Sequence, residues 1–200
     1  MRAPVVFIVA SCVAGALLFP PGVFAEEKKK KKSEPEAPRK GVPGVTGNDP
    51  APAPKGGGKV PAAAAEFLQV HNDARARVGV APLRWSETLA RHAQEWADHL
   101  ASTGSFQHRD RSKSGYGENL FGGSEGYGPA DAARNWLEER AAYRGDPVTP
   151  QNFQSVGHYT QMVWSGTTEV GYGMARGRNG MVIIVGNYSP RGNRSGQRPY

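Results

Sequence analysis

Two stretches near the middle of the chain have apolar residues at helical spacing. Apolar side chains recur every three or four positions from 66 to 78, and Gly79 follows them. This spacing predicts an amphipathic helix over 66–78. A second helix is predicted between Ser86, whose hydroxyl can cap the first turn, and Gly104, a residue typical of helix ends. Its apolar stripe consists of Leu89, Ala93, Trp96, Ala97 and Leu100.

Residues 117–188 combine one more helical segment with strand patterns. A third helix is predicted from Pro129 to about Tyr143. The stretches Glu169–Arg176 and Met181–Tyr188 are rich in β-forming residues, and the glycine-containing segment between them predicts a hairpin. Gly117–Phe121 predicts a short additional strand. Three helices before a small antiparallel sheet predict an α+β fold in which the helices cover the sheet.

The first 63 residues differ in composition from the rest. Residues 1–25 combine a basic start, an apolar stretch and small residues before Ala25, which predicts a secretory signal and a secreted, extracellular or periplasmic protein. Residues 26–63 are rich in Lys, Pro and Gly and predict a disordered linker, so the folded domain is predicted over 64–200. Cys12 is the only cysteine and leaves with the signal, so the domain has no disulfide. Lipoprotein anchoring through Cys12 is the second alternative.

The net charge of +7 is concentrated outside the predicted domain. Residue 2 and the stretch 26–63 hold 10 of the 25 basic and 5 of the 18 acidic residues, which leaves 15 and 13 in 64–200. A domain with so little excess positive charge does not have the electrostatic footprint of a nucleic-acid binder. Lys28–Lys32 is interpreted as a solvated spacer, with docking on an anionic envelope polymer or a membrane surface as the alternative.

Four titratable residues of the predicted domain have apolar, glycine or aromatic neighbours. Glu118 lies in a predicted strand, where a carboxylate requires a partner. At 100° per residue, Glu139 faces the apolar side of the third helix, whereas Glu138 faces solvent. Together with His108 and His158 these carboxylates could hold a divalent metal such as zinc. A buried hydrogen-bond network is the structural alternative, and a metal-dependent hydrolase with Glu118 or Glu139 as general base is the catalytic one.

The remaining histidines are interpreted more simply. His92, Glu95 and His99 share one face of the second helix, away from its apolar stripe, so an ordinary polar surface is predicted there. His71, in the first helix, is predicted to make a structural hydrogen bond.

Several segments between residues 71 and 193 also follow one another in a specific order. They are His71–Arg75, Pro82–Trp85, Tyr116–Leu120, Trp136–Glu139 with Tyr143, Gly157–Trp164, and Gly186–Pro190 with Gly192-Asn193. In this order they resemble the CAP superfamily, also called the SCP domain, and most closely the plant pathogenesis-related proteins of class 1. The resemblance covers about residues 66–200.

The resemblance implies an α-β-α sandwich with a central cleft lined by His108, Glu118, Glu139 and His158. Relatives can bind zinc or other divalent cations there, some members bind lipids or sterols, and others act in defence or virulence. A binding protein for a cation and a lipid-like ligand is therefore expected rather than an enzyme. The stretch Pro190–Tyr200 resembles an ending that plant relatives can release as a signalling peptide, so an interaction module acting through this C-terminal arm is a further alternative.

Overall fold

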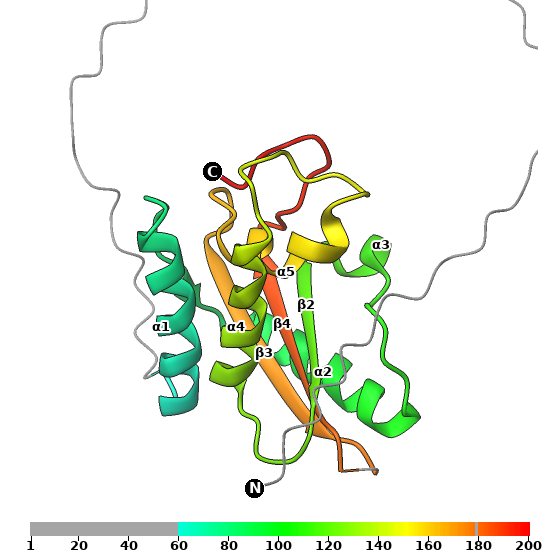
Figure 1. Cartoon of the computed structure of the whole chain (residues 1–200). Helices are drawn as coiled ribbons and strands as arrows, with labels where there is room; N and C mark the ends of the chain where they lie inside the picture. The colour runs from blue at the N-terminus through cyan, green and yellow to red at the C-terminus, as the bar shows by residue number, and fades with distance from the viewer. Residues whose placement is uncertain (1–59, 179) are drawn as a thin grey trace, which may run out of the picture. The chain divides into compact units, whose positions relative to one another are not determined.

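The computed structural model describes residues 60–178 and 180–200, so the predicted signal, Cys12 and Lys28–Lys32 lie outside the described residues. Figure 1 shows the arrangement of the elements. The helices are α1 (Ala62–Ala76), α2 (Glu87–Thr103), α3 (Arg111–Ser114), α4 (Pro129–Glu138), η1 (Glu139–Ala141, a 3-10 helix) and α5 (Phe153–Met162). The strands are β1 (Arg84–Trp85), β2 (Gly117–Gly123), β3 (Glu169–Arg176) and β4 (Val182–Ser189).

The first two helices follow their sequence signals closely. The Ser86 hydroxyl accepts a hydrogen bond from the Leu89 amide at 3.5 Å, and Gly104 ends α2 in the left-handed conformation with φ of 69°. Both are the caps that the sequence predicts. Helix α1 begins at Ala62, so the end of the predicted linker is helical, because its run of alanines favours a helix.

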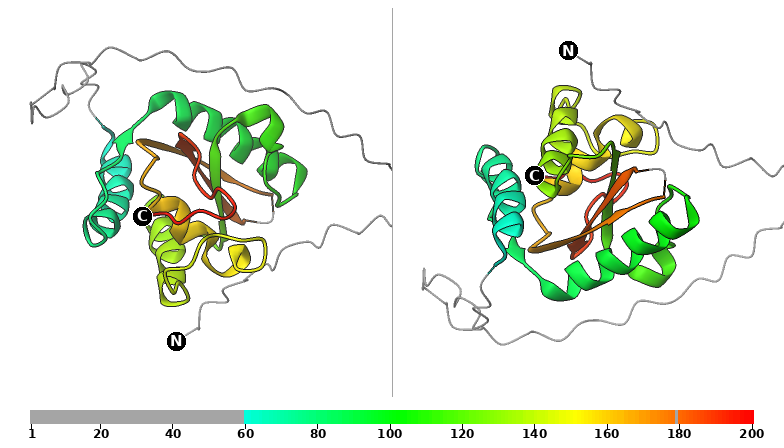
Figure 2. Two further views of the ribbon diagram at one scale, coloured as in Figure 1. Left: turned by 90° about the horizontal axis from the view of Figure 1, so that it is seen from above. Right: turned by 90° about the horizontal axis from the view of Figure 1, so that it is seen from below.

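The sheet lies between two layers of helices. Its strand order is β1-β3-β4-β2. Helix α2 covers one face, and α1, α4 and α5 lie on the other, as the two views of Figure 2 show. The predicted α-β-α sandwich is therefore confirmed. The sheet is mixed rather than wholly antiparallel, because β1 pairs in parallel with β3 through Arg84 and Glu169.

Two segments differ from the sequence prediction. The third predicted helix ends as α4 at Glu138 and continues only as the 3-10 turn η1. Residues 153–162, for which the sequence predicts no helix, form α5. Gln154 and Ser155 of α5 are exposed, but the polar residues Thr160 and Gln161 are buried, so polar residues do not mark one exposed face of the segment.

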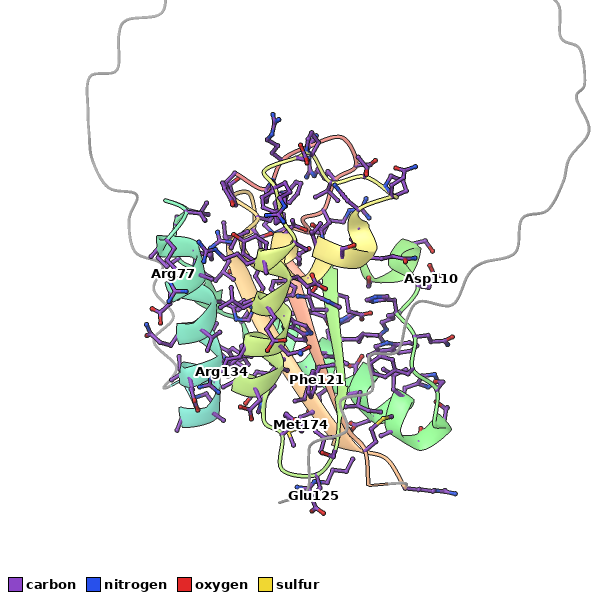
Figure 3. All side chains as sticks on the ribbon, viewed as in Figure 1. Arg77, Asp110, Phe121, Glu125, Arg134 and Met174 are labelled. Atoms are coloured by element: carbon purple, nitrogen blue, oxygen red, sulfur yellow. The ribbon has the colours of Figure 1, made fainter. Side chains whose placement is uncertain are left out.

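The core consists of two apolar layers, one on each face of the sheet. Ile184 and Tyr188 of β4 pack with Phe67 and Trp136 under α1 and α4. Ile183 and Val185 point the other way and pack under α2, as strand alternation requires. At the surface, Arg134 of α4, which is labelled in Figure 3, pairs with Glu66 of α1 at 2.6 Å and with Asp131 at 3.0 Å.

The buried guanidinium of Arg75 connects α1 to a distant loop. Its Nε donates to the Ala81 carbonyl at 2.6 Å. Its terminal nitrogens donate to the carbonyl oxygens of Met162, Trp164 and Thr167, each at 2.9 Å. Only 1% of the residue is exposed, and no carboxylate within the described ranges pairs with it. The charge is therefore satisfied by main-chain oxygens alone.

The C-terminal arm packs on the domain. The Gly196 amide donates to the Val148 carbonyl at 2.8 Å, and the Val148 amide donates back to Gln197 at 2.9 Å. The Ser165 amide donates to the Pro199 carbonyl at 2.7 Å. The arm is thus attached to two loops through main-chain bonds. Among the helices of the described part, none has the length and apolar composition that crossing a bilayer requires.

Candidate functional site: two histidine–glutamate pairs

Glu139 and His158 form the first pair. The η1 turn places the Glu139 carboxylate against the first turns of α5. Its Oε1 lies 2.7 Å from His158 Nδ1, and its Oε2 accepts the main-chain amides of His158 at 2.7 Å and Tyr159 at 3.1 Å. The Glu139 side chain is 19% exposed, and neighbouring Glu138 faces solvent, which confirms the predicted orientations of both. Glu139 therefore fixes both the His158 ring and the backbone beside it.

Glu118 and His108 form the second pair. Glu118 lies at the start of β2, and its Oε1 is 2.8 Å from His108 Nδ1 and 3.0 Å from the Arg109 amide. Only 9% of the Glu118 side chain is exposed, whereas 41% of the His108 side chain is. The second carboxylate oxygen, Oε2, is buried and has no hydrogen-bond partner among the described residues. This oxygen is an acceptor without a donor, which is costly for a buried carboxylate.

In both pairs the carboxylate contacts Nδ1 of the histidine and makes no contact with Nε2. Glu118 and Glu139 each contact an Nδ1, so a neutral ring donates its proton there and has its lone pair on Nε2. A carboxylate bound to the far nitrogen of a histidine is the usual support of a metal-binding imidazole. Imidazole nitrogens and carboxylate oxygens are also the kinds of ligand atom that zinc prefers in proteins.

The two pairs are connected through the sheet but do not merge into one cluster. Asn119 follows Glu118 on β2, and its Nδ2 donates to the His158 carbonyl at 3.2 Å. The ring of His158 also stacks on Trp136, with centroids 6.2 Å apart. Within residues 60–178 and 180–200, no three His, Cys, Asp or Glu side chains are arranged to hold a metal ion. The structure thus brings the four predicted residues together as two pairs.

His92 is a contact that sequence reasoning missed. Its Nδ1 lies 2.8 Å from Asn187 Oδ1 on β4, and its ring meets Tyr116 edge-on at 5.0 Å. Asn187 is the cross-strand partner of Glu118, so His92 belongs to the surroundings of the second pair. Glu95 and His99 remain on the exposed polar face that the sequence predicts. The sequence does not distinguish His92 from Glu95 and His99, because the contact between His92 and Asn187 depends on the register of β4 in the sheet.

His71 makes structural hydrogen bonds, as predicted. Its Nδ1 lies 2.9 Å from the Phe67 carbonyl, and its Nε2 lies 2.9 Å from the Tyr188 hydroxyl. That hydroxyl also accepts from Asn119 Nδ2 at 3.1 Å, which links His71 to the strand beside the second pair. Burial lowers the pKa of His71 to about 4, and the positive charge of Arg75 acts in the same direction. The imidazole is therefore neutral in the folded protein at neutral pH.

The neutral state of His71 predicts loss of stability in acid. The unfolded imidazole titrates near 6.5, so between pH 6.5 and 4 the unfolded state binds a proton that the folded state does not. The contribution of His71 is complete above pH 6.5, and about 3 kcal/mol is lost as the pH falls to 4. Urea denaturation over this range measures it. The His71→Gln variant is expected to lack this component, whereas the exposed control His99→Gln retains it; equal slopes in all three proteins would contradict the assignment.

Neither of the two cavities described in the structure is lined by these pairs. One cavity of about 480 Å³ lies beside η1 and Tyr200, and one of about 280 Å³ lies between the end of α2 and the β3–β4 hairpin. The histidine–glutamate pairs therefore lie apart from both of these cavities.

Known proteins have sequences similar to this chain. A sequence profile of the CAP family, described as the cysteine-rich secretory protein family, matches residues 68–188. Pathogenesis-related protein 1A of Nicotiana tabacum is 40% identical over 136 residues, which cover 68% of this chain and 79% of the relative. Pathogenesis-related leaf protein 4 of Solanum lycopersicum is 41% identical over 135 residues, which cover 68% and 82%.

Solved structures agree at the level of the fold. The crystal structure of NaASP2 with Zn2+ aligns with a TM-score of 0.61 and 26% identity, covering 74% of this chain and 90% of the other. The structure of BmVAL-1 aligns with the same TM-score at 24% identity, covering 72% and 84%, and so supports the fold alone. The family profile and the relatives together show that this chain belongs to the CAP family and resembles plant pathogenesis-related proteins of class 1.

Proposed function

We propose that the protein is a secreted CAP-domain binding protein that holds a divalent cation, zinc in the first instance, through the Nε2 atoms of His108 and His158. The observation that carries the proposal is the contact of each Nδ1 with a glutamate, which leaves Nε2 as the free ligand atom. Glu118 and Glu139 act as positioning residues, because each carboxylate contacts one imidazole through its Nδ1. A bound cation would supply a positive centre to which an anionic partner can attach.

Binding is favoured over hydrolysis by the state of the two carboxylates. A general base needs a free oxygen within reach of the water that it activates. Glu139 accepts three hydrogen bonds, and the only unpartnered oxygen of Glu118 is buried. Neither carboxylate is therefore placed as a base, although both are well placed to orient an imidazole.

A role in defence or virulence and a lipid-like ligand are further parts of the proposal. The role is supported by the pathogenesis-related names of the plant relatives. The proposal of a lipid-like ligand is supported by the resemblance to the family. The predicted signal over residues 1–25 supports secretion.

Calorimetric titration of zinc into the full chain tests the cation site. We expect one ion per chain, and His108→Ala or His158→Ala should each weaken binding at least tenfold, the lower end of the range for losing support around a metal. Glu139→Gln should weaken it as well, because the His158 ring loses its partner. His99→Ala is the matched control, since that ring is exposed on α2, and it should leave the affinity unchanged.

Two outcomes would contradict the shared site. If the folded parent binds no zinc, the pairs are a structural network only. If it binds two ions, each lost with a different histidine, the imidazoles act separately. Circular dichroism of every variant distinguishes loss of ligand from loss of folding.

A further inference from the structure

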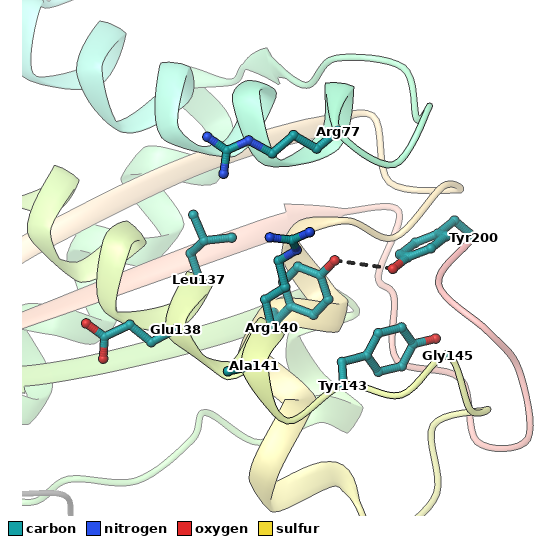
Figure 4. Close-up of a pocket in the computed structure, with 9 residues that line it drawn as sticks. Arg77, Leu137, Glu138, Arg140, Ala141, Tyr143, Gly145 and Tyr200 are labelled. Atoms are coloured by element: carbon teal, nitrogen blue, oxygen red, sulfur yellow. Dashed lines mark hydrogen bonds between the residues drawn. The ribbon is translucent and has the colours of Figure 1, made fainter.

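A cavity of about 480 Å³ opens where the end of α1, the η1 turn and the last residue of the chain meet (Figure 4). It is separate from the histidine–glutamate pairs, since none of their four residues lines it. Its size falls within the range of small-molecule sites. The lining residues that matter here are Arg77, Leu137, Arg140, Tyr143, Tyr159 and Tyr200.

The charge of the cavity favours an anion. Arg77 reaches it from the end of α1 and Arg140 from η1, and neither forms an ion pair with a carboxylate within the described ranges. Glu138 is the one acidic side chain in the lining. Figure 4 shows its carboxylate pointing away from Arg140 and Tyr200, and it accepts a hydrogen bond from Asn135 at 3.4 Å. Two guanidinium groups thus remain available for a ligand.

The tyrosines at the other end offer protons rather than charges. The Tyr159 and Tyr200 hydroxyls are 3.3 Å apart, and the positive charge of Arg140 is close enough to act on the Tyr159 hydroxyl. Burial raises the pKa of Tyr159, so its phenol stays protonated. One hydroxyl of the pair donates to the other, which leaves one phenolic proton without an acceptor in the pair. A row of donors, Arg140, Tyr159 and Tyr200, therefore faces the cavity.

The walls of the cavity are aromatic. The Tyr143 ring lies 5.7 Å from Tyr159 and 6.0 Å from Tyr200, the latter at a near-perpendicular angle. Leu137 adds an aliphatic surface beside the two arginines (Figure 4). The Tyr143 hydroxyl itself is buried and has no hydrogen-bond partner among the described residues, so Tyr143 contributes its ring to the wall. A further aromatic ring can pack against these tyrosine rings in an offset-stacked or an edge-to-face arrangement.

We propose that this cavity binds an organic anion that combines a carboxylate with a flat aromatic ring system. The carboxylate contacts Arg140 and the free phenolic proton, because a guanidinium recognises a carboxylate through paired hydrogen bonds. The ring lies against the tyrosines and Leu137. Inorganic phosphate would satisfy the donors but leave the apolar walls without a partner.

Titration of 2-naphthoate into the full chain, followed by NMR, tests the proposal. 2-Naphthamide, which has the same ring without the charge, and decanoate, which has the charge without the ring, are the matched ligands. We expect 2-naphthoate to bind at least tenfold more tightly than either. Arg140→Gln should weaken 2-naphthoate binding at least tenfold, the usual effect of losing a charge-assisted bond. Tyr200→Phe should weaken it about fivefold, and Arg144→Gln, an exposed arginine outside the lining, should have no effect.

Three results would overturn the proposal. Equal binding of 2-naphthamide would remove the role of the arginines, and equal or tighter binding of decanoate would make the cavity an aliphatic lipid site. No change in the spectrum with any of the three ligands would show that the cavity accepts no small anion. Zinc titration of the same samples is an independent measurement, because the cavity shares no residue with the histidine–glutamate pairs.

Discussion

Replacing Arg75 with Met is expected to lower the free energy of unfolding by about 4 kcal/mol or more, although Met fills much of the same volume. The guanidinium donates to four carbonyl oxygens, of Ala81, Met162, Trp164 and Thr167. A thioether donates to none of them, and each buried acceptor left without a donor costs about 1–3 kcal/mol. Urea denaturation of parent and variant measures the difference.

Two further variants separate the hydrogen bonds from the charge. Burial lowers the pKa of Arg75 to about 10, so the side chain is charged in the folded protein at neutral pH. Arg75→Lys keeps a charge but lacks the planar fork, and its stability is expected to lie between those of the parent and the Met variant. Arg77→Met, two residues later and exposed, should change stability by less than about 0.5 kcal/mol. An equal effect at both positions would refute the role of the four carbonyls.

Gly173→Ala is expected to destabilise the fold by about 3 kcal/mol, at the upper end of overpacking. Strand β3 runs so close under α2 that a Cβ at Gly173 would lie 2.2 Å from the Gln94 amide nitrogen and 2.3 Å from its Cα. Both are backbone atoms in the middle of a helix, so no side chain can rotate to make room. The helix must move away from the sheet, which opens the layer that contains Leu100 and Ile183.

The matched control is Gly166→Ala, because its Cβ would lie 3.6 Å from the nearest atom, an ordinary contact. This variant should change the thermal midpoint little, whereas Gly173→Ala should lower it by several degrees or more. If Gly173→Ala melts with the parent, α2 is able to shift and the close packing is not needed for stability.

The close packing of Gly173 against α2 illustrates which features could be predicted from the sequence and which could not. Helix α2 was predictable because one stripe is apolar, Ser86 is a strong cap and Gly104 is a strong stop. Strand β1 was not, since two residues cannot display an alternating pattern. Gly173 was identified only as part of a strand, because the helix that excludes a side chain there lies about 80 residues earlier in the sequence.

For the candidate site as well, the sequence predicted some features and not others. Helical periodicity was sufficient to orient Glu139 inward, even though the helix tightens into a 3-10 turn at that residue. Which carboxylate contacts which histidine depends on how β2, η1 and α5 meet, and spacing along the chain does not specify that. His92 was assigned to the surface for the same reason, because its contact with Asn187 depends on strand register.

The four carbonyls that Arg75 contacts also have a consequence for how the chain folds as it is made. Three of them lie 87 to 92 residues after the guanidinium in the sequence. At about 5–20 residues per second, a ribosome needs roughly 5–20 seconds to add that stretch. During this interval the first helix has neither these three main-chain partners nor the β4 face on which Phe67 packs. The N-terminal half is therefore not an independent folding unit, and the native core forms only when the last strand has been synthesised.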